Sequence, residues 1–282
     1  MKFVALIIVF MVLVLSLVTS IVPGSRGYGN KNPVAILGEE LAKPLAKVDQ
    51  IGPEISNALD RVDVKLPSLP GSKKSQTGED KSLGDHSGAD FSNKDLPGAN
   101  FAGSFFSATQ FESTLLDSAV FEGVSGADIN FRQARMAKSN LTAAMLAGGD
   151  FTGAELREAV ARAGDFETAV FTGGDLSFAS FSGANLRDAN LKDVYAAGAV
   201  FVDANLSNAD LTDADLTGVR FEGANLQNVK FGGANLKLAK LTGARLQGAD
   251  LSSVINLTTE QLAEACANGD TKLPEGLAAP RC

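Results

Sequence analysis

A bulky apolar side chain recurs at every fifth position from Phe91 to Leu251, and this regularity limits the possible folds more than any other feature. Of the 33 positions in the series, 30 are Phe, Leu or Met. The exceptions are Gly126, Ala161 and Ala196. Neither an α-helix, with a period of 3.6, nor a flat strand, with a period of two, keeps a five-residue pattern on one side. The sequence therefore predicts a coil that turns a corner every five residues.

The repeating unit is plain in the run 183–191: a small residue, Asp or Asn, Leu or Phe, and two mostly polar or Gly positions. Over about 165 residues, this unit resembles that of the pentapeptide-repeat proteins, loosely A-(D/N)-L-x-x. The resemblance implies an all-β solenoid, a right-handed, quadrilateral parallel β-helix with one pentapeptide per side and about eight rungs. The central residue and the small residue two before it are then expected to point inward. The tail 266–277 is similar to the ending of many bacterial members, which places the chain in a bacterium.

Stacked rungs should give the core a layered interior, because no pentapeptide can bury a side chain alone. Sorting the centres by a period of 20 gives four columns. One column is predicted to stack its rings, and it contains Phe91, Phe111, Phe131, Phe151 and Phe171. Another column, from Leu96 to Leu236, has no Phe and should be aliphatic. Around 125–129 the motif comes two residues early, which predicts a β-bulge.

The chain divides into five segments. They are a transmembrane anchor or signal segment (1–24), an amphipathic helical region (33–66), a flexible linker (67–87), the β-helix (88–256) and a C-terminal cap and tail (257–282). Residues 3–22 carry no charge and are long enough to span a bilayer. We favour an uncleaved single-pass anchor, with the repeat domain periplasmic or lumenal; the alternative is a signal peptide cleaved after about Ser20, which would make the protein secreted.

The amphipathic region precedes the linker. Its apolar residues recur at spacings of three and four: Val34, Leu37, Leu41, Leu45 and Val48. Pro44 and Pro53 should kink or divide the helix. Two roles remain open for this region. The helix could lie on the membrane surface or on the rod, or it could mediate self-association or docking to a partner helix.

The carboxyl end should close the rod. Thr258 and Gln261 have capping-box spacing, so a short helix through Ala265 is predicted over the last rung. The only two cysteines, Cys266 and Cys282, are expected to form a disulfide in an exported protein and to be free thiols in a cytosolic one. Thiol titration of the denatured, unreduced protein distinguishes the two.

No catalytic, cofactor-binding or metal-binding motif is present, which argues against an enzyme. His86, the only histidine, is expected to be a solvated linker residue, and the two cysteines lack further ligands for a metal. The net charge of −8 disfavours binding to nucleic acid. The last rungs are locally basic through Arg220, Lys230, Lys237, Lys240 and Arg245, which we interpret as a fluctuation of surface charge.

Outward positions should be polar, so apolar residues there are candidates for an interface. The candidate interface residues are Phe105, Val120, Met145, Val160, Tyr195, Val200 and Val202. Further apolar residues at outward positions include Leu115, Val170, Phe178 and Leu238. Three of the valines fall in one column at intervals of 40 residues, and Phe105 and Met145 repeat this interval in the adjoining column.

These features together predict a non-enzymatic, membrane-tethered scaffold or accessory subunit, which binds an unknown protein through the β-helix surface. The alternative is suggested by soluble relatives in the resembled family that mimic duplex DNA and bind topoisomerases such as gyrase. The acidic repeat fits that alternative loosely, whereas the apolar amino terminus and the basic last rungs oppose it. Neither the partner nor the oligomeric state is predicted.

Overall fold

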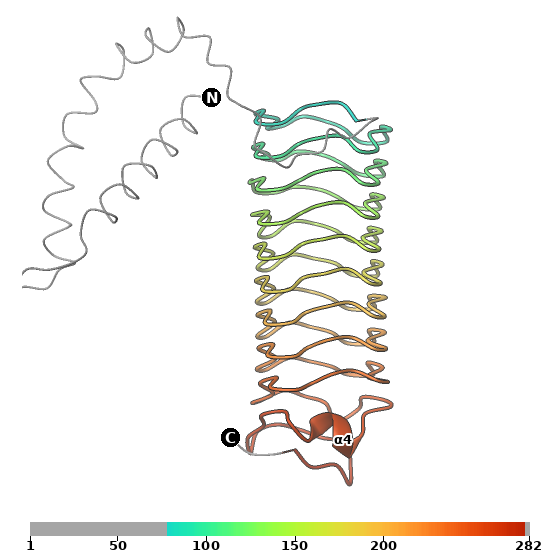
Figure 1. Cartoon of the computed structure of the whole chain (residues 1–282), viewed down its shortest axis with the longest axis vertical. Coiled ribbons are helices and arrows are strands. Elements are labelled where there is room, and N and C mark those ends of the chain that lie inside the picture. The colour runs from blue at the N-terminus through green and yellow to red at the C-terminus, as the bar shows by residue number, and fades with distance from the viewer. Residues whose placement is uncertain (1–77, 280–282) are drawn as a thin grey trace, which may run out of the picture. The chain divides into compact units, whose positions relative to one another are not determined.

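The computed structural model describes residues 78–279, and in them the chain winds as a four-sided parallel coil (Figure 1). Single-residue parallel bridges link positions 20 apart, beginning with Asp80 and Asn100 and continuing to Asn235 and Ile255. Each turn of the coil, called a rung, therefore makes four bridges, one on each side. Among the described residues the only helix is α4 (Thr259–Leu262), and the bridged positions are too short to form named strands.

Each pentapeptide makes one side and one corner. The N–H of Ala99 donates to the Leu96 carbonyl at 3.2 Å, which closes the turn between two centres. The second residue after each centre has a positive φ, as in Gly98 (66°) and Asp188 (57°). Gly adopts this left-handed conformation freely and Asn and Asp tolerate it, which explains why these residues recur at the corner.

The faces are numbered by their buried centres: face 1 contains Phe91, face 2 Leu96, face 3 Phe101 and face 4 Phe106. Each face includes the outward residue before its centre and the two turn residues after it. The chain passes through faces 1 to 4 in order within each rung. Face 2 therefore lies opposite face 4.

The predicted stack of rings on face 1 is confirmed. Ring centroids of successive Phe residues from Phe91 to Phe171 lie 5.0, 4.9, 5.0 and 4.8 Å apart, and the rings are within 13° of parallel. The centres of face 2 are aliphatic and buried, as expected. Since the rungs align the rings directly over one another, each Phe buries both faces of its ring against a neighbour.

The predicted bulge at 125–129 is wrong. Ser125 pairs with both Phe105 and Met145, so no residue is inserted and the 20-residue register continues. Gly126 takes the place of a centre, and a Cβ there would collide with the carbonyl oxygen of Phe106. Ile129 is fully buried at the next inward position.

The β-helix begins earlier than the predicted boundary at 88. Asp80 and Asp85 already pair with the next rung, so the residues just before 88 belong to the rod and not to a linker. His86 takes the position of a centre, with its ring centroid 5.6 Å from Phe101 and 5.5 Å from Phe106. Its Nε2 lies 3.0 Å from the Lys81 carbonyl oxygen. The expectation of a solvated histidine is corrected, because this imidazole packs among aromatic rings.

The predicted C-terminal cap is present, although α4 ends at Leu262 rather than Ala265. Thr258 and Gln261 form the capping box. Gln261 Nε2 also donates to the carbonyl oxygens of Leu236 and Ala239, at 2.7 and 2.9 Å. These bonds satisfy carbonyls of the last full rung, while Leu262, the last residue of α4, is fully buried. Below it, the tail adds bridges between Arg245 and Cys266 and between Asp250 and Lys272.

Several predictions fall outside the described residues: the anchor or signal segment (1–24), the amphipathic region (33–66), most of the linker and the partner cysteine Cys282. The predicted disulfide therefore stays a prediction. Within residues 78–279, no helix has the length and apolar character needed to cross a bilayer.

Candidate interaction surfaces

Several aspartates of the rod are engaged in their own turns. Asp90 Oδ1 accepts the Ser92 N–H at 2.8 Å, and hydrogen bonds from the Ser92 side chain and backbone lower the pKa of Asp90. Asp210 Oδ1 accepts both the N–H and the hydroxyl of Thr212, at 3.1 and 2.6 Å. These carboxylates stabilise corners locally and are not gathered in a cleft, so they serve as turn formers.

The C-terminal half of face 4 carries a ladder of amides. Asn205 Nδ2 donates to Asn185 Oδ1 at 3.3 Å, and Asn225 Nδ2 donates to Asn205 Oδ1 at 3.0 Å. The same face therefore changes from apolar at its N-terminal end, where Phe105 and Met145 lie, to polar at its C-terminal end. Face 4 therefore carries apolar and polar side chains at the same outward position in different rungs, which allows the two kinds to be compared by substitution.

The basic residues of the last rungs do not form one patch. Arg220 and Lys240 lie on face 3, Lys230 on face 1 and Arg245 on face 4. Arg220 also pairs with Glu222 at 3.1 Å, and Lys230 lies 3.9 Å from Asp210. Their separation around the rod agrees with a fluctuation of surface charge rather than a binding site for an anion.

Four of the predicted interface residues come together on faces 3 and 4. Phe105 and Met145 are 48% and 55% exposed, two rungs apart on face 4. Val120 and Val160 are half-buried in the adjoining column of face 3. Leu83, 55% exposed, lies against Gly103 at the corner between the two faces. We call these five residues the Phe105 patch.

Small residues connect the members of the Phe105 patch. The corner positions between the two faces are Gly103, Gly123, Ala143 and Ala163. Because these corner residues are small, they do not project between the two faces. The larger side chains of both faces are therefore accessible to one partner. Leu83 was not expected in this surface, because the sequence pattern placed it in the linker.

The other three predicted residues lie apart from this patch. Val200 and Val202 are half-buried on face 3, further along the rod, and Tyr195 is 61% exposed on face 2. Because face 2 lies opposite face 4, no single flat surface contains Phe105 and Tyr195. The candidate residues therefore divide into two surfaces, and their use in binding stays a prediction.

Face 2 has its own exposed apolar residues. Phe178 is 56% exposed, Leu238 is 71% exposed and Ile255 is 52% exposed, and they accompany Tyr195 along the C-terminal half of the face. Phe178 and Leu238 were recognised in the sequence as apolar residues at outward positions. Ile255 was missed because it follows the last regular repeat; the continued count of five would have found it.

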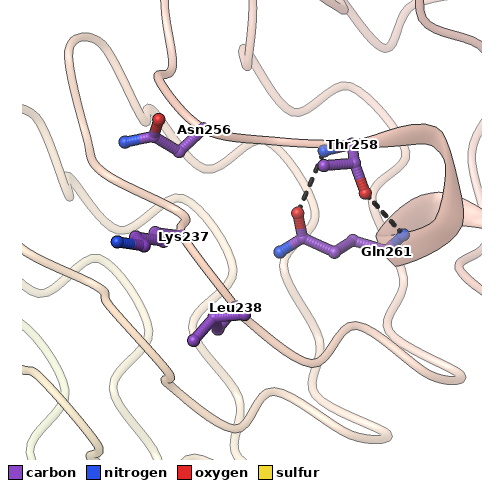
Figure 2. A pocket seen from close by; sticks show the side chains of 5 residues that line it. All are labelled: Lys237, Leu238, Asn256, Thr258 and Gln261. Atoms are coloured by element: carbon purple, nitrogen blue, oxygen red, sulfur yellow. Dashed lines mark hydrogen bonds between the residues drawn. The ribbon is translucent and has the colours of Figure 1, made fainter.

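A shallow pocket of about 330 Å³ lies where face 2 meets the cap (Figure 2). It is lined by Lys237, Leu238, Asn256, Thr258 and Gln261. Figure 2 shows that the two hydrogen bonds between Thr258 and Gln261 are the capping-box bonds of α4, so these polar atoms serve the cap. Among residues 78–279, no group of three His, Cys, Asp or Glu side chains is placed to hold a metal ion.

Comparison with known protein families identifies the repeat. A family model described as "Pentapeptide repeat region" matches residues 164–241, and a second, "Pentapeptide repeats (8 copies)", matches residues 87–125 and 127–160. Together they cover more than half of the 282 residues. No curated protein matches the sequence.

Several solved structures are similar. HetL, a pentapeptide repeat protein involved in heterocyst differentiation regulation from the cyanobacterium Nostoc sp. strain PCC 7120, is 23% identical, with 60% of this chain and 90% of that chain covered and a TM-score of 0.43. Full-length QnrB1, a plasmid-mediated fluoroquinolone resistance protein, is 16% identical, with 65% and 92% covered and a TM-score of 0.38. A pentapeptide repeat protein from the Arabidopsis thaliana thylakoid lumen is 32% identical, with 34% and 67% covered and a TM-score of 0.23.

The family models and the ladder of bridges agree on the same unit. The matched residues are those in which the parallel bridges recur every five positions and pair 20 apart. The buried centres also keep the five-residue spacing throughout these residues. The chain therefore belongs to the pentapeptide-repeat family, and its rod is a right-handed, quadrilateral parallel β-helix.

Proposed function

We propose that this protein is a non-enzymatic, membrane-tethered scaffold or accessory subunit, which binds a partner protein through the Phe105 patch. The observation that carries the proposal is the grouping of five apolar side chains, three exposed and two half-buried, on two adjoining faces of a rod whose outward positions are otherwise mostly polar. Single exposed apolar residues are common on soluble proteins, whereas contiguous groups mark interaction surfaces.

The Phe105 patch suits an apolar partner surface. Phe105 can supply a large aromatic contact, and Met145 can adapt to an irregular partner because its side chain is unbranched and flexible. Of the outward residues between them on face 4, only Asp128 is charged. A partner would therefore bury apolar area at the centre of the contact, with polar residues at the rim, as in other protein interfaces.

A variant pair tests the role of this surface. Phe105→Asp and Met145→Asp should each reduce recovery of the cross-linked partner by at least about tenfold, because a charge would be buried in the contact. Asn225→Asp, at the equivalent outward position of the same face, is the matched control and should leave recovery unchanged. Equal loss from all three variants, or from none of them, would contradict the assignment of the partner site.

The membrane tether rests on the uncharged run 3–22 of the sequence. A tethered protein should fractionate with membranes and be released by detergent but not by high salt, with the rod accessible to protease from the periplasmic or lumenal side. Full-length protein in the soluble fraction would contradict the tether. A mature chain that lacks the first 20 or so residues would instead show a secreted protein.

The gyrase-binding alternative has less support. A mimic of duplex DNA needs continuous negative charge along the rod, and Arg220, Lys230 and Lys240 interrupt it in the last rungs. A supercoiling assay with gyrase and the full chain discriminates between the functions. Inhibition or protection at stoichiometric protein would favour the alternative, whereas no effect in large excess would remove it.

A further inference from the structure

Three large apolar residues of the rod occupy turn positions that favour Gly, Asn or Asp. Leu83, Phe178 and Leu238 have φ values of 57°, 59° and 59°. For residues with a Cβ this left-handed conformation is unfavourable, and the three side chains are also 55%, 56% and 71% exposed. Within the rod, the Phe178 ring lies against Gly198 and 5.4 Å from the Arg157 guanidinium, and Leu83 lies against Gly103. All three residues nevertheless remain more than half exposed, so a contact outside the rod is a physical explanation for their apolar character.

Phe178 and Leu238 share one column of face 2, three rungs apart. The two positions between them in the column are Gly198 and Gly218. Read along the rod, the column is apolar, Gly, Gly, apolar, and it has the same order in both directions. At a rung spacing of about 4.8 Å, its ends are roughly 14 Å apart.

The glycines make a shallow depression between the two apolar side chains. A Cβ at Gly198 would lie 2.7 Å from a ring carbon of Phe178, so the ring leans over this glycine toward the middle of the column. A Cβ at Gly218 would meet no atom within 4 Å, so the space above it is open. Gly218 can therefore receive a side chain from another molecule.

We propose that face 2 is the contact surface of an antiparallel homodimer. The two-fold axis passes between the rung of Gly198 and the rung of Gly218, so that each column meets itself in reverse. Phe178 then packs against Leu238 of the second copy, and Gly198 lies opposite Gly218 of that copy. The same contacts occur twice, as an isologous interface requires.

The polar residues of face 2 also match in this arrangement. Tyr195, 61% exposed, lies opposite Asp215 of the second copy, so its hydroxyl can donate to a carboxylate. Lys237 lies opposite Ser177 of that copy, within reach of the neighbouring Asp175. A parallel arrangement would instead place Phe178 opposite Asp175 and Leu238 opposite Asn235, which leaves both apolar side chains against polar ones.

A second copy of this chain is favoured over an unrelated protein as the partner of face 2, because in the antiparallel arrangement face 2 complements itself in shape, apolar character and charge. The contact is a narrow strip about 19 Å long over four rungs, which is small for a protein interface. A weak, concentration-dependent dimer is therefore expected. Since face 4 is opposite face 2, dimerisation would leave both copies of the Phe105 patch exposed, and the dimer would present two partner sites.

Sedimentation equilibrium of the full chain in detergent tests the proposal through the dimer dissociation constant. Phe178→Lys and Leu238→Glu should each raise this constant at least tenfold, because a charge would face an apolar side chain. The double variant Phe178→Lys/Leu238→Glu should restore it to within about threefold of the original value, since the two new charges attract across the antiparallel contact. Phe105→Asp, on the opposite face, is the control and should leave the constant unchanged.

Three results would overturn the proposal. They are a full chain that stays monomeric at all concentrations, single variants that do not weaken the dimer, and a double variant that is no better than the singles. Thermal unfolding by circular dichroism should show that each variant stays folded, because both positions are exposed. Retention of the partner by Phe105→Asp, together with an intact dimer, would contradict the function proposed for the Phe105 patch and leave the dimer proposal standing.

Discussion

The buried ring column of face 1 and the exposed apolar residues at turn positions use the same side chains with opposite consequences. Phe151 is fully buried, with its ring centroid 5.0 Å from that of Phe131 and 4.8 Å from that of Phe171. Phe178, 27 positions later, is 56% exposed on a left-handed turn. In this repeat, the place within the pentapeptide decides whether a phenylalanine stabilises the fold, and residue type alone does not.

This contrast separates two kinds of evidence. An apolar centre is explained by the core, because burying a large side chain contributes about 1.5–3 kcal/mol. An apolar residue on a left-handed turn opposes the local conformation by about 1–2 kcal/mol, and Phe178 and Leu238, which remain 56% and 71% exposed, gain only partial burial in exchange. Phe178 and Leu238 therefore indicate an external contact more strongly than Val200, whose extended backbone suits a β-branched residue.

The largest expected effect is the difference in free energy of unfolding between the same substitution, Phe to Asp, at two positions. Phe151→Asp should destabilise the rod by more than about 5 kcal/mol, because it leaves a cavity and buries a carboxylate among aromatic rings. Phe178→Asp should change the free energy of unfolding by less than about 1 kcal/mol. Chemical denaturation of both variants measures the difference. Similar losses of stability would contradict the distinction between a buried centre and an exposed turn residue.

The cap should show an intermediate effect. Gln261→Ala removes the side-chain donor that binds the carbonyl oxygens of Leu236 and Ala239, at 2.7 and 2.9 Å. We expect a loss of about 2 kcal/mol, because the Ala239 carbonyl loses its partner, the Leu236 carbonyl keeps only the Ala239 N–H, and the capping box is broken. Amide hydrogen exchange should rise first in the last rung. Lys237→Ala, which changes the same pocket, should cost less than about 0.5 kcal/mol.

A smaller effect of opposite sign should follow from relieving the turn. Leu238→Asn places a residue that tolerates positive φ at this corner, so the free energy of unfolding should rise by about 0.5–1 kcal/mol. The same variant should weaken the face 2 dimer. Thermal unfolding and sedimentation together measure both changes, and a variant that is less stable would argue that Leu238 supports the fold.

The smallest effect concerns pH. The Lys272 ammonium, followed by the Ser252 hydroxyl and N–H, lowers the pKa of Asp250 to about 2 from an ordinary 3.8. A carboxyl with a depressed pKa in the folded state stabilises the protein fully above about pH 3.8, and this contribution is lost as the pH falls through about 2. Both side chains are largely solvated, so the contribution should be no more than about 0.5 kcal/mol.

Comparison of the original protein with Asp250→Asn measures this contribution. The melting temperatures should differ slightly at pH 5 and converge as the pH approaches 2. A difference that grows as the pH falls would contradict the role of the Asp250–Lys272 pair, whose atoms lie 2.8 Å apart.

Several features escaped the sequence pattern for identifiable reasons. His86 is not apolar, so its place at a centre was hidden until the pairing of Asp85 with Phe105 showed the register. The motif at Gly126 looked shifted because Ile129 is large at a position that is usually small. Parallel pairing with the rung before and the rung after imposed the regular register at Gly126, because a shift in register would have broken the hydrogen bonds to both neighbouring rungs.

The period of five by itself determined a coil with a corner every five residues and its apolar inward positions, because only such a corner keeps one side apolar. The four sides, and with them the assignment of each residue to a face, came from the resemblance to the pentapeptide-repeat family. The capping-box spacing likewise determined where the closing helix begins. Only the tertiary structure decided the first rung, the partial burial of His86 among aromatic rings, the reach of Gln261 to the rung beneath it and the degree of exposure at each outward position. These properties depend on contacts between residues about 20 positions or more apart, and a local pattern cannot specify how such contacts fill space.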